Sequence, residues 1–573
     1  MLKEINQIFD KNDRKIIGVS IFFSLIVSVT EVFGITMLFP FMGVVSDPSN
    51  IQKNKYLKYF YENIAMSNYK KFIMYFGTGI ILVFIFKNII SLAFNYYSTI
   101  VARKLNRKYS NRLFKTYLDF EYINYVKKNR SEFIRIVTQE CGLLVGIFQN
   151  AANLISEATI MLLLYIMMLY VNWKLTLSMT LFLLLNILII KFIVIKKSKE
   201  MGKTREEKSR VFYKIVNSIF SNYKFIKLSG NHSDIQKEYD LALEKNDEIQ
   251  IKQAILTPIP KSMLEFSGFF MIVSIVLFSI MKYGEDGMAE ILPIVSLFFL
   301  SLYRMLPSII RIVGIFQGFA FMSPVPERIK NELSYEKENL GDKKIEFRGK
   351  IEIRNLKFQY KEDELILNNI SINVGKGESV AFIGESGSGK TTLVDILMGL
   401  YKPLSGDIYI DNQKVDKNNL KAWREKIGYI PQEIYLFDGT VAENIVFGSE
   451  YNEERIIEVL KKAKIWDFLK GKNGIYTKVG DAGVMLSGGQ KQRIGIARAL
   501  YKDPEILVLD EATSALDDNT EREIMNEMYN LSSGKTLIMI AHRLSSLKRC
   551  HRIYELEKGV LKKEYSHIRE VKG

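Results

Sequence analysis

Long apolar runs in the first 325 residues constrain the fold of this chain more than any other feature. Six can be delimited, at about residues 16–45, 72–100, 142–171, 174–196, 256–283 and 289–319. Each is long enough for a helix to cross a hydrocarbon core of about 30 Å. The first run has no small-residue cleavage pattern, so we interpret it as a membrane helix rather than a signal peptide. The sequence therefore predicts a helical membrane domain of six spans over residues 1–325.

The composition divides the 573 residues into two unlike parts. Hydrophobic residues make up 48% of the chain and charged residues 25%, but residues 345–573 read as an ordinary globular domain. We expect a linker at 326–344. The net charge of +16 would suit nucleic acid, yet the basic residues gather beside apolar runs, as in 103–115 and 191–208. That placement favours a membrane face, with membrane lipids and no nucleic acid as partners.

The connections between the apolar runs predict an orientation. Links 101–141 and 197–255 are long, basic and helix-like, so the positive-inside rule assigns them to the cytoplasm. Both chain termini and the second domain then lie on the cytoplasmic side of a multi-pass protein of the bacterial inner membrane. Loop 46–71, which this topology places outside, carries Lys53, Lys55 and Lys58 and opposes the assignment, although the bias elsewhere is larger.

The outer loop contains its own helical pattern. In KYLKYFYENIAM, Leu57, Phe60, Tyr61 and Ile64 follow i, i+3, i+4, i+7 spacing, which predicts an external amphipathic helix at about 51–66. Its aromatic residues and lysines suit the membrane surface. Simple capping of the helix bundle is the alternative.

The sharpest motif of the second domain is IGESGSGKTT at residues 383–392. It fits G-x-x-x-x-G-K-[ST], follows the strand-like run SVAFI and precedes a helix-like run, which is the context of a phosphate-binding loop. In such a loop backbone N–H groups curl around phosphates, Lys390 reaches the terminal phosphates and Thr391 ligates Mg²⁺. We therefore expect ATP to be bound by Gly384, Glu385, Ser386, Gly387, Ser388, Gly389, Lys390, Thr391 and Thr392.

Two further motifs complete the site. ILVLDEATSALD (506–517) places Asp510 at the end of a strand, where it would hold Mg²⁺, and Glu511 beside it to orient or deprotonate the attacking water. LSGGQKQR (486–493) is a serine–glycine turn that enters a helix and offers a second phosphate cradle. One chain does not need two cradles for one nucleotide unless a second copy supplies the other half.

Together these motifs, in this order, resemble those of ATP-binding cassette proteins. Six spans followed by a cassette resemble the exporter-type half-transporters, which implies a helical membrane domain followed by an α/β P-loop domain. The resemblance implies an ATPase that works as a homodimer, with Glu511, His542 and Gln432 in catalysis and Thr391, Gln432 and Asp510 at Mg²⁺. It further implies that Tyr360 stacks on adenine and that Ser487, Gly488, Gly489 and Gln490 bind nucleotide. Coupling helices are expected around Asn129–Thr138 and Asn222–Asp234.

Charges inside the apolar runs bear on the cargo. We counted the bases Lys87, Lys261, Arg304 and Arg311 against the acids Glu31 and Glu265, an excess of +2 per chain. Charges at membrane depth usually face a cavity, and arginine can grip phosphate with two parallel hydrogen bonds. This reasoning leads to an anionic amphiphile. The alternative for each base is an ordinary solvated residue below the bilayer.

Over almost its full length the chain also resembles the lipid-linked oligosaccharide flippases of bacterial protein N-glycosylation, in stretches such as LYRMLPS (302–308) and IGYIPQEIYLF (427–437). That resemblance implies a polyprenyl-pyrophosphate oligosaccharide as cargo, the four bases at its pyrophosphate and residues 51–66 at its tail. Two of the four bases, Lys87 and Lys261, are lysine at positions where these flippases have arginine. An exporter of another amphiphile, such as a lipid A-like lipid or a drug, and a nucleotide-gated channel remain alternatives.

Overall fold

The computed structural model describes residues 7–46, 48–53, 55–63, 68–283, 288–361, 364–510, 518–541, 543 and 547–571. The chain forms two compact units. The first contains Met1–Phe120 and Lys127–Glu336, and the second contains Glu121–Val126 and Lys337–Gly573. A short piece of the amino-terminal half thus belongs to the second unit.

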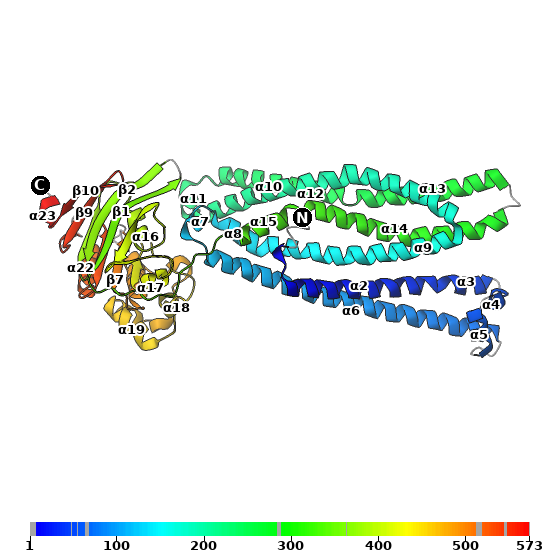
Figure 1. The fold of residues 1–573 in the computed structure, drawn as a ribbon, viewed down its shortest axis with the longest axis horizontal. Helices are drawn as coiled ribbons and strands as arrows, with labels where there is room; N and C mark the ends of the chain where they lie inside the picture. Colours follow the sequence, from blue (N-terminus) through cyan, green and yellow to red (C-terminus); the bar gives the residue numbers. More distant parts are fainter. Residues whose placement is uncertain are drawn as a thin grey trace. The chain divides into compact units, whose positions relative to one another are not determined.

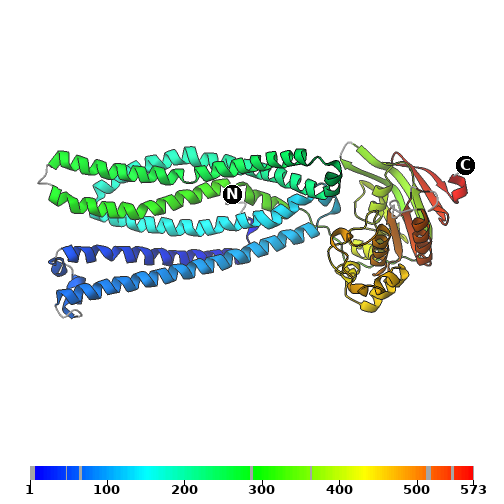
Figure 2. The same ribbon diagram turned by 180° about the vertical axis from the view of Figure 1, so that it is seen from behind.

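Helices build the described part of the first unit (Figures 1 and 2). The long ones are α2 (Lys11–Thr36), α6 (Tyr69–Leu118), α9 (Cys141–Ile190), α10 (Lys196–Ser221), α12 (His232–Leu256), α13 (Ile259–Tyr283) and α14 (Met288–Phe321). Shorter elements are α3 (Leu38–Ser46), α4 (Asn50–Lys53), α5 (Lys55–Asn63), α8 (Arg130–Arg135), η1 (Ile136–Glu140), η2 (Lys191–Ile195), α11 (Tyr223–Ser229) and α15 (Pro324–Leu333). Apolar side chains of α9, α12, α13 and α14 form a shared core.

The chain reverses direction near the middle of α9. Helical hydrogen bonding is assigned from Cys141 to Ile190. Contacts with α14 nevertheless show a turn, because a Cβ added at Gly318 would lie 3.5 Å from Asn150, whereas Gly202 lies against Phe321. Asn150, near the start of α9, and Gly202, beyond the end of α9, therefore lie at the same end of α14. The boundary between spans at 172–173 stays a prediction, and these contacts require a reversal in its neighbourhood.

Three helical stretches within the described residues are long and apolar enough to cross a membrane: Lys11–Gly34, Tyr69–Leu118 and Arg130–Tyr170. A fourth results if Met305–Phe321 and Pro324–Leu333, bent by 44° at the break between them, count as one span. The residues predicted to form the last two spans lie on α13 and α14. The number of six stays a prediction.

Half-buried ion pairs join α15 to α8, to α10 and to the residues before α8. Arg328 of α15 pairs with Glu132 of α8 and Glu206 of α10, and Lys128 pairs with Glu332 at 2.8 Å. These contacts hold α15 in the first unit. The expected linker at 326–344 therefore begins as a packed helix, and the division between units falls after Glu336.

Two sheets form the second unit (Figures 1 and 2). The first has the order β2-β1-β4-β5 and contains β1 (Lys350–Lys361), β2 (Glu364–Gly375), β4 (Ser405–Ile410) and β5 (Gln413–Lys414). The second has the order β10-β9-β3-β8-β7-β6 and contains β3 (Ser379–Ile383), β6 (Ile427–Ile430), β7 (Ile506–Asp510), β8 (Thr536–Ile540), β9 (Arg552–Glu557) and β10 (Val560–Tyr565).

Helices complete the second unit. They are α7 (Tyr122–Val126), α16 (Lys390–Leu397), α17 (Leu420–Glu425), α18 (Val441–Val446), α19 (Glu453–Lys462), α20 (Trp466–Lys470), α21 (Gly488–Leu500), α22 (Asp518–Leu531) and α23 (Ile568–Val571), with 3-10 turns η3 (Gly474–Tyr476) and η4 (Asp481–Gly483). One apolar core joins both sheets and α16. A second core joins α18, α19 and α21 to the other face of the large sheet.

The central strands of the large sheet are parallel and buried on both faces. Their sequences SVAFI, ILVLD and TLIMI are continuous apolar runs for that reason. Strand β8 pairs in parallel with both β3 and β7, and β7 pairs in parallel with β6. The residues that follow these four strands therefore emerge at one edge of the sheet, where ligands of such sheets bind.

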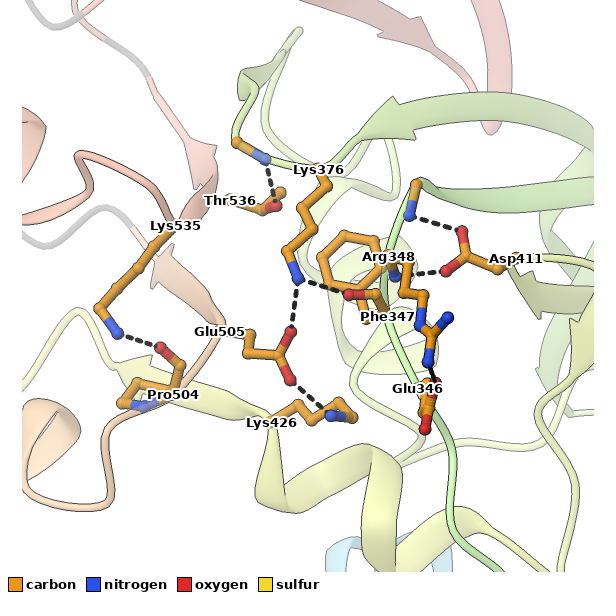
Figure 3. A network of polar contacts seen from close by, with 12 residues as sticks. Glu346, Phe347, Arg348, Lys376, Asp411, Lys426, Pro504, Glu505, Lys535 and Thr536 are labelled. Carbon is orange, nitrogen blue, oxygen red and sulfur yellow. Dashed lines mark hydrogen bonds and ion pairs between the residues drawn. The ribbon is translucent and has the colours of Figure 1, made fainter.

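A polar network holds the opposite edge (Figure 3). Glu505, just before β7, accepts hydrogen bonds from Lys426 at 2.5 Å and from Lys376 at 3.0 Å. Burial alone would raise the pKa of Glu505, but these two ammonium groups hold it below its ordinary value. Asp411 accepts backbone hydrogen bonds from Gly349 at 2.8 Å and Lys350 at 2.6 Å. The Glu505 carboxylate thus links the amino ends of β7, β6 and β3 of the large sheet.

Candidate nucleotide-binding and transport sites

The predicted phosphate-binding loop lies between β3 and α16. Gly384, Gly387 and Gly389 have φ values of 141°, 81° and 98°, which disfavour any residue with a Cβ. A Cβ on Gly389 would also lie 2.6 Å from Leu367. Glu385 and Ser386 are exposed on the loop. The backbone therefore curls as the motif predicted.

Lys390 lies across this loop. Its ammonium group donates to the carbonyl oxygens of Gly384 at 2.9 Å and Glu385 at 2.8 Å, and the residue is 5% exposed. The Ser388 hydroxyl is buried and has no hydrogen-bond partner among the described residues. A loop with a buried ammonium group, an unsatisfied hydroxyl and the amino terminus of α16 suits a phosphate chain. Thr391 is exposed at the second position of that helix.

The Mg²⁺ residues come from neighbouring strands. Asp510 is the last residue of β7, and Tyr429 of β6 donates to it at 3.3 Å. Gln432 is exposed two residues beyond β6. The Thr391 hydroxyl and the Asp510 carboxylate are hard oxygen ligands, so the donor set fits Mg²⁺. Burial and the charge of Asp510 raise the pKa of Asp395 on α16 to about 7.

Two predicted catalytic residues, Glu511 and His542, lie outside the described residues. Glu511 directly follows β7, and His542 follows β8 after one residue. The strand order places β8 between β3 and β7. The catalytic roles of both residues stay predictions.

The predicted adenine residue belongs to an aromatic cluster. Tyr360 forms a hydrogen bond with Thr392 of 3.0 Å between hydroxyl oxygens. Its ring is 5.4 Å from the ring of Tyr401, and Tyr401 is in turn 5.3 Å from the ring of Tyr122 on α7. Ile123 of α7 packs against the same apolar core. An aromatic path thus runs from α7 to the residue expected to stack on adenine.

The stretch expected to hold the first coupling helix, Asn129–Thr138, belongs to the first unit, and its role stays a prediction. Asn129 caps α8 by accepting from the Ser131 backbone at 3.1 Å, and α8 belongs to the first unit. It is α7 that packs in the second unit. The apolar and aromatic residues of EYINYV (121–126) could have indicated this packing, but they form a short stretch within the long helix-like link 101–141.

The signature motif begins α21. Ser487 accepts a hydrogen bond from the Gln490 backbone at 3.3 Å, and its own backbone donates to the Gln490 side chain at 2.9 Å. The Gln490 side chain is therefore engaged in capping the helix. Leu486 is buried, whereas Ser487 and Gly488 are exposed. Gly489 follows in the first turn.

Three of the four bases predicted to bind the cargo have acidic partners. Lys87 lies 3.6 Å from Glu31, and Lys261 lies 3.9 Å from Glu265. Arg311 pairs with Glu157, with Nε 2.5 Å from Oε1 and Nη2 3.2 Å from Oε2. Arg304 lies on α14 in the helical backbone, and its side chain is outside the described residues.

Sequence reasoning missed Glu157. It lies in the apolar run 142–171, within LISEAT, and was omitted from the charge count. Glu157 adds a third acid to the six charges counted above. Over the full bounds of the six runs the sum is eight bases against four acids, because Lys174, Lys191, Lys196, Lys282 and Glu290 also fall within them.

The apolar face of the external helix packs against other residues of the protein. Leu57, Phe60 and Tyr61 pack against a small core that contains the fully buried Phe72. This arrangement favours the capping alternative for these residues. Tyr56 and Tyr59 of α5 are 85% and 67% exposed. Ile64 and residues up to 67 lie outside the described part, so α5 ends here at Asn63.

Comparisons with known proteins agree with this organisation. The family model described as ABC transporter transmembrane region matches residues 17–303, and the one described as ABC transporter matches residues 367–514. A heterocyst differentiation ATP-binding protein of a Nostoc species is 30% identical, over 84% of this chain and 80% of its own length. An ATP-dependent lipid A-core flippase of Saccharophagus degradans is also 30% identical, over 82% and 80%.

A multidrug resistance ABC transporter of Lactococcus lactis is 31% identical, over 71% of this chain and 70% of its own. Among solved structures, a bacterial Atm1-family ABC exporter with ATP bound superposes with a TM-score of 0.80 at 20% identity, covering 98% of this chain and 96% of that one. The fold is therefore that of an ABC exporter.

The chain belongs to the ABC transporters. It is a multi-pass membrane exporter of the half-transporter type, and its cassette binds ATP and couples ATP hydrolysis to transport.

Proposed function

We propose that this protein is a homodimeric flippase of the bacterial inner membrane that moves an anionic lipid-linked substrate, a polyprenyl-pyrophosphate oligosaccharide, from the cytoplasmic leaflet outward. The observation that carries the proposal is the charge cluster in the membrane unit. Lys87 of α6 and Arg311 of α14 are held by Glu31 of α2 and Glu157 of α9, and Lys87 and Arg311 are close enough to repel each other.

The depth of this cluster suits a head group. Lys87 lies about 27 Å along the helix axis from Tyr69, the first residue of α6. Arg311 lies about 34 Å from Met288, the first residue of α14. If each helix enters a hydrocarbon core of about 30 Å at its first residue, Lys87 lies near the far edge of the core and Arg311 just beyond it, where water, acidic partners and an anionic head group can reach both. A pyrophosphate offers charge and the geometry that arginine binds.

The cassette would supply the energy. The loop from Gly384 to Gly389, Lys390 and the amino terminus of α16 would hold the phosphates, and Tyr360 would stack on the adenine. Mg²⁺, held by Thr391 and Asp510 with Gln432 nearby, would neutralise charge that develops on the phosphates. Glu511 would orient the attacking water, and His542 would lie near the γ-phosphate.

A second copy would complete each site. Ser487 and Gly488 are exposed at the amino terminus of α21, and this terminus suits a phosphate bound to another cassette. ATP would then close the two cassettes, and hydrolysis would release them. Coupling to the membrane unit would pass through α7.

Two observations favour a second candidate, export of another amphiphile. The relatives include a lipid A-core flippase and a multidrug transporter. The ion pairs of Lys87 with Glu31 and of Arg311 with Glu157 also weaken the demand for a strongly anionic cargo. A nucleotide-gated channel has no supporting observation.

Reconstitution tests the proposal. The protein in liposomes should move a fluorescent polyprenyl-pyrophosphate oligosaccharide between leaflets when ATP and Mg²⁺ are added. Movement should stop in Glu511→Gln, which should bind ATP and stay in the closed dimer. Arg304→Ala should lose transport more than basal ATP hydrolysis. Stimulation of ATP hydrolysis by drugs or lipid A, without movement of the pyrophosphate lipid, would favour the second candidate.

A further inference from the structure

The Arg311–Glu157 pair has the geometry that arginine also uses for phosphate. Two neighbouring guanidinium nitrogens, Nε and Nη2, face the two carboxylate oxygens at 2.5 and 3.2 Å. Such paired contacts give both strength and direction. One edge of the guanidinium group therefore already holds an anion, and that anion belongs to the protein.

The two partners differ in exposure. The Glu157 side chain is 12% exposed, whereas the Arg311 side chain is 50% exposed. The Glu157 carboxylate is held within the helix bundle. Beside it, the side-chain hydroxyl groups of Ser156 on α9 and Ser28 on α2 form a hydrogen bond of 2.8 Å that joins the two helices. The guanidinium group is the accessible partner. An incoming anion therefore meets Arg311 first and encounters the charge of Glu157 behind it.

A second pair repeats the arrangement. Lys87 and Glu31 come from α6 and α2, are 3.6 Å apart and are 16% and 17% exposed. The positive charge of Arg311 also repels that of Lys87. These two bases and two acids sum to zero. The head group of a lipid with several negative charges therefore enters a cluster that is neutral as a whole.

We propose that Glu157 is an internal competitor for the substrate's anion at Arg311, and thereby a specificity-determining residue of the transport site. Its charge repels an anion bound to Arg311, and its carboxylate pairs again with Arg311 when the anion leaves. Binding is weakened and release is aided. This role rests on the proposed function, because it needs an anionic head group.

The sign of the effect can be derived from electrostatics. Repulsion by one fixed carboxylate grows with the charge of the ligand. Removing the charge should therefore tighten binding of a pyrophosphate most, of a monophosphate less and of a neutral alcohol not at all. A purely structural role for Glu157 predicts weaker or unchanged binding that does not depend on ligand charge.

The test measures equilibrium binding of three fluorescent polyprenyl probes, a pyrophosphate, a monophosphate and the free alcohol, to the purified full-length protein. Glu157→Gln should lower the dissociation constant of the pyrophosphate by about tenfold, a modest value because Arg311 is half exposed. In liposomes the same variant should transport the pyrophosphate lipid more slowly at saturation, because release is impaired. Thermal unfolding establishes that the variant is folded.

Two controls isolate the pair. Glu248→Gln makes the same chemical change in an exposed pair on α12, where Glu248 and Lys252 have side chains 57% and 55% exposed, and should leave probe binding unchanged. Arg311→Ala combined with Glu157→Gln should show none of the gain. Unchanged or weaker binding in Glu157→Gln, or an equal gain for the neutral alcohol, would overturn the role of Glu157 alone. Failure of both phosphate probes to bind the wild-type protein and Glu157→Gln would overturn the proposed cargo together with it.

Discussion

The ring of Tyr122, on the six-residue segment that leaves the membrane unit, lies 5.3 Å from the ring of Tyr401 in the cassette. Tyr401 is 6% exposed and also contacts Tyr360 and Phe358. The contact is therefore part of the cassette core. Movement of α7 would therefore shift Tyr401 and, through it, the ring of Tyr360, which is expected to stack on adenine.

Tyr122→Ala should uncouple the two activities of the protein. Loss of the ring removes packing between α7 and Tyr401, at a cost of about 2–3 kcal/mol for a partly exposed aromatic residue. We expect a higher KM for ATP and loss of transport with basal hydrolysis largely kept. ATP hydrolysis and lipid movement measured on the same liposomes check this. Tyr122→Phe keeps the ring and should behave as wild type; equal losses in both variants would contradict the coupling.

Asp395→Asn should change how stability depends on pH. The pKa of Asp395 is raised from an ordinary 3.8 to about 7 by burial and by the charge of Asp510. A raised carboxyl pKa favours the protonated folded state, so this contribution is complete below pH 3.8 and is lost as pH rises through 7. Without nucleotide and Mg²⁺, the variant should gain thermal stability over wild type at pH 8 and little at pH 5.

For that comparison, Asp467→Asn on α20 is the matched control, because Asp467 is exposed. The difference in melting temperature between Asp467→Asn and wild type should be the same at pH 5 and at pH 8. A stability difference for Asp395→Asn that is the same at pH 5 and pH 8 would rule out titration of Asp395 as the cause.

Arg328→Ala should destabilise the first unit. Arg328 is 13% exposed and pairs with carboxylates from two other helices, Glu132 and Glu206. Removing it leaves two acids without their cation, and such losses cost about 3 kcal/mol. A lower melting temperature in detergent checks this. Lys330→Ala, on the same helix, removes the same charge and should have a small effect; similar losses would show that only net charge matters.

Tyr59→Ala and Phe60→Ala should separate ligand binding from folding on α5. Tyr59 is 67% exposed, whereas Phe60 packs against the buried Phe72. If α5 engages the lipid tail, Tyr59→Ala should raise the half-saturating concentration of long-tailed substrates without lowering the melting temperature. Phe60→Ala should lower the melting temperature. Equal transport of long and short tails by wild type and Tyr59→Ala would exclude tail binding by this residue.

The cassette was predictable because its motifs are local. A phosphate-binding loop needs glycines at fixed spacing between a strand and a helix, and Gly384 to Lys390 satisfy that requirement within seven residues. The parallel strands could be recognised as apolar runs because both of their faces are buried. The order of β3, β8, β7 and β6 could not be read in this way, because pairing of strands far apart in sequence has no local signal.

The transport site was predicted less well for a physical reason. An ion pair between helices joins residues remote in sequence, as Arg311 and Glu157 show, and the helical period gives no indication of the partner. Glu157 itself lies in the apolar run 142–171 and could have been counted, but its pairing with Arg311 could not be read from the sequence. The same limit applies to α7. Its packing against Tyr401 joins residues remote in sequence, so its short aromatic segment could not be assigned to the second unit from the sequence.

The capping interaction between Ser487 and Gln490 has a consequence for how two copies would meet. The signature turn is already ordered within a single chain, because both ends of its hydrogen-bonding pair are satisfied before any partner arrives. Ordering a loop on association would consume conformational entropy, and this turn avoids that loss. Closure of a dimer around ATP would then resemble the docking of rigid surfaces, with a rate set by encounter and nucleotide occupancy rather than by local folding.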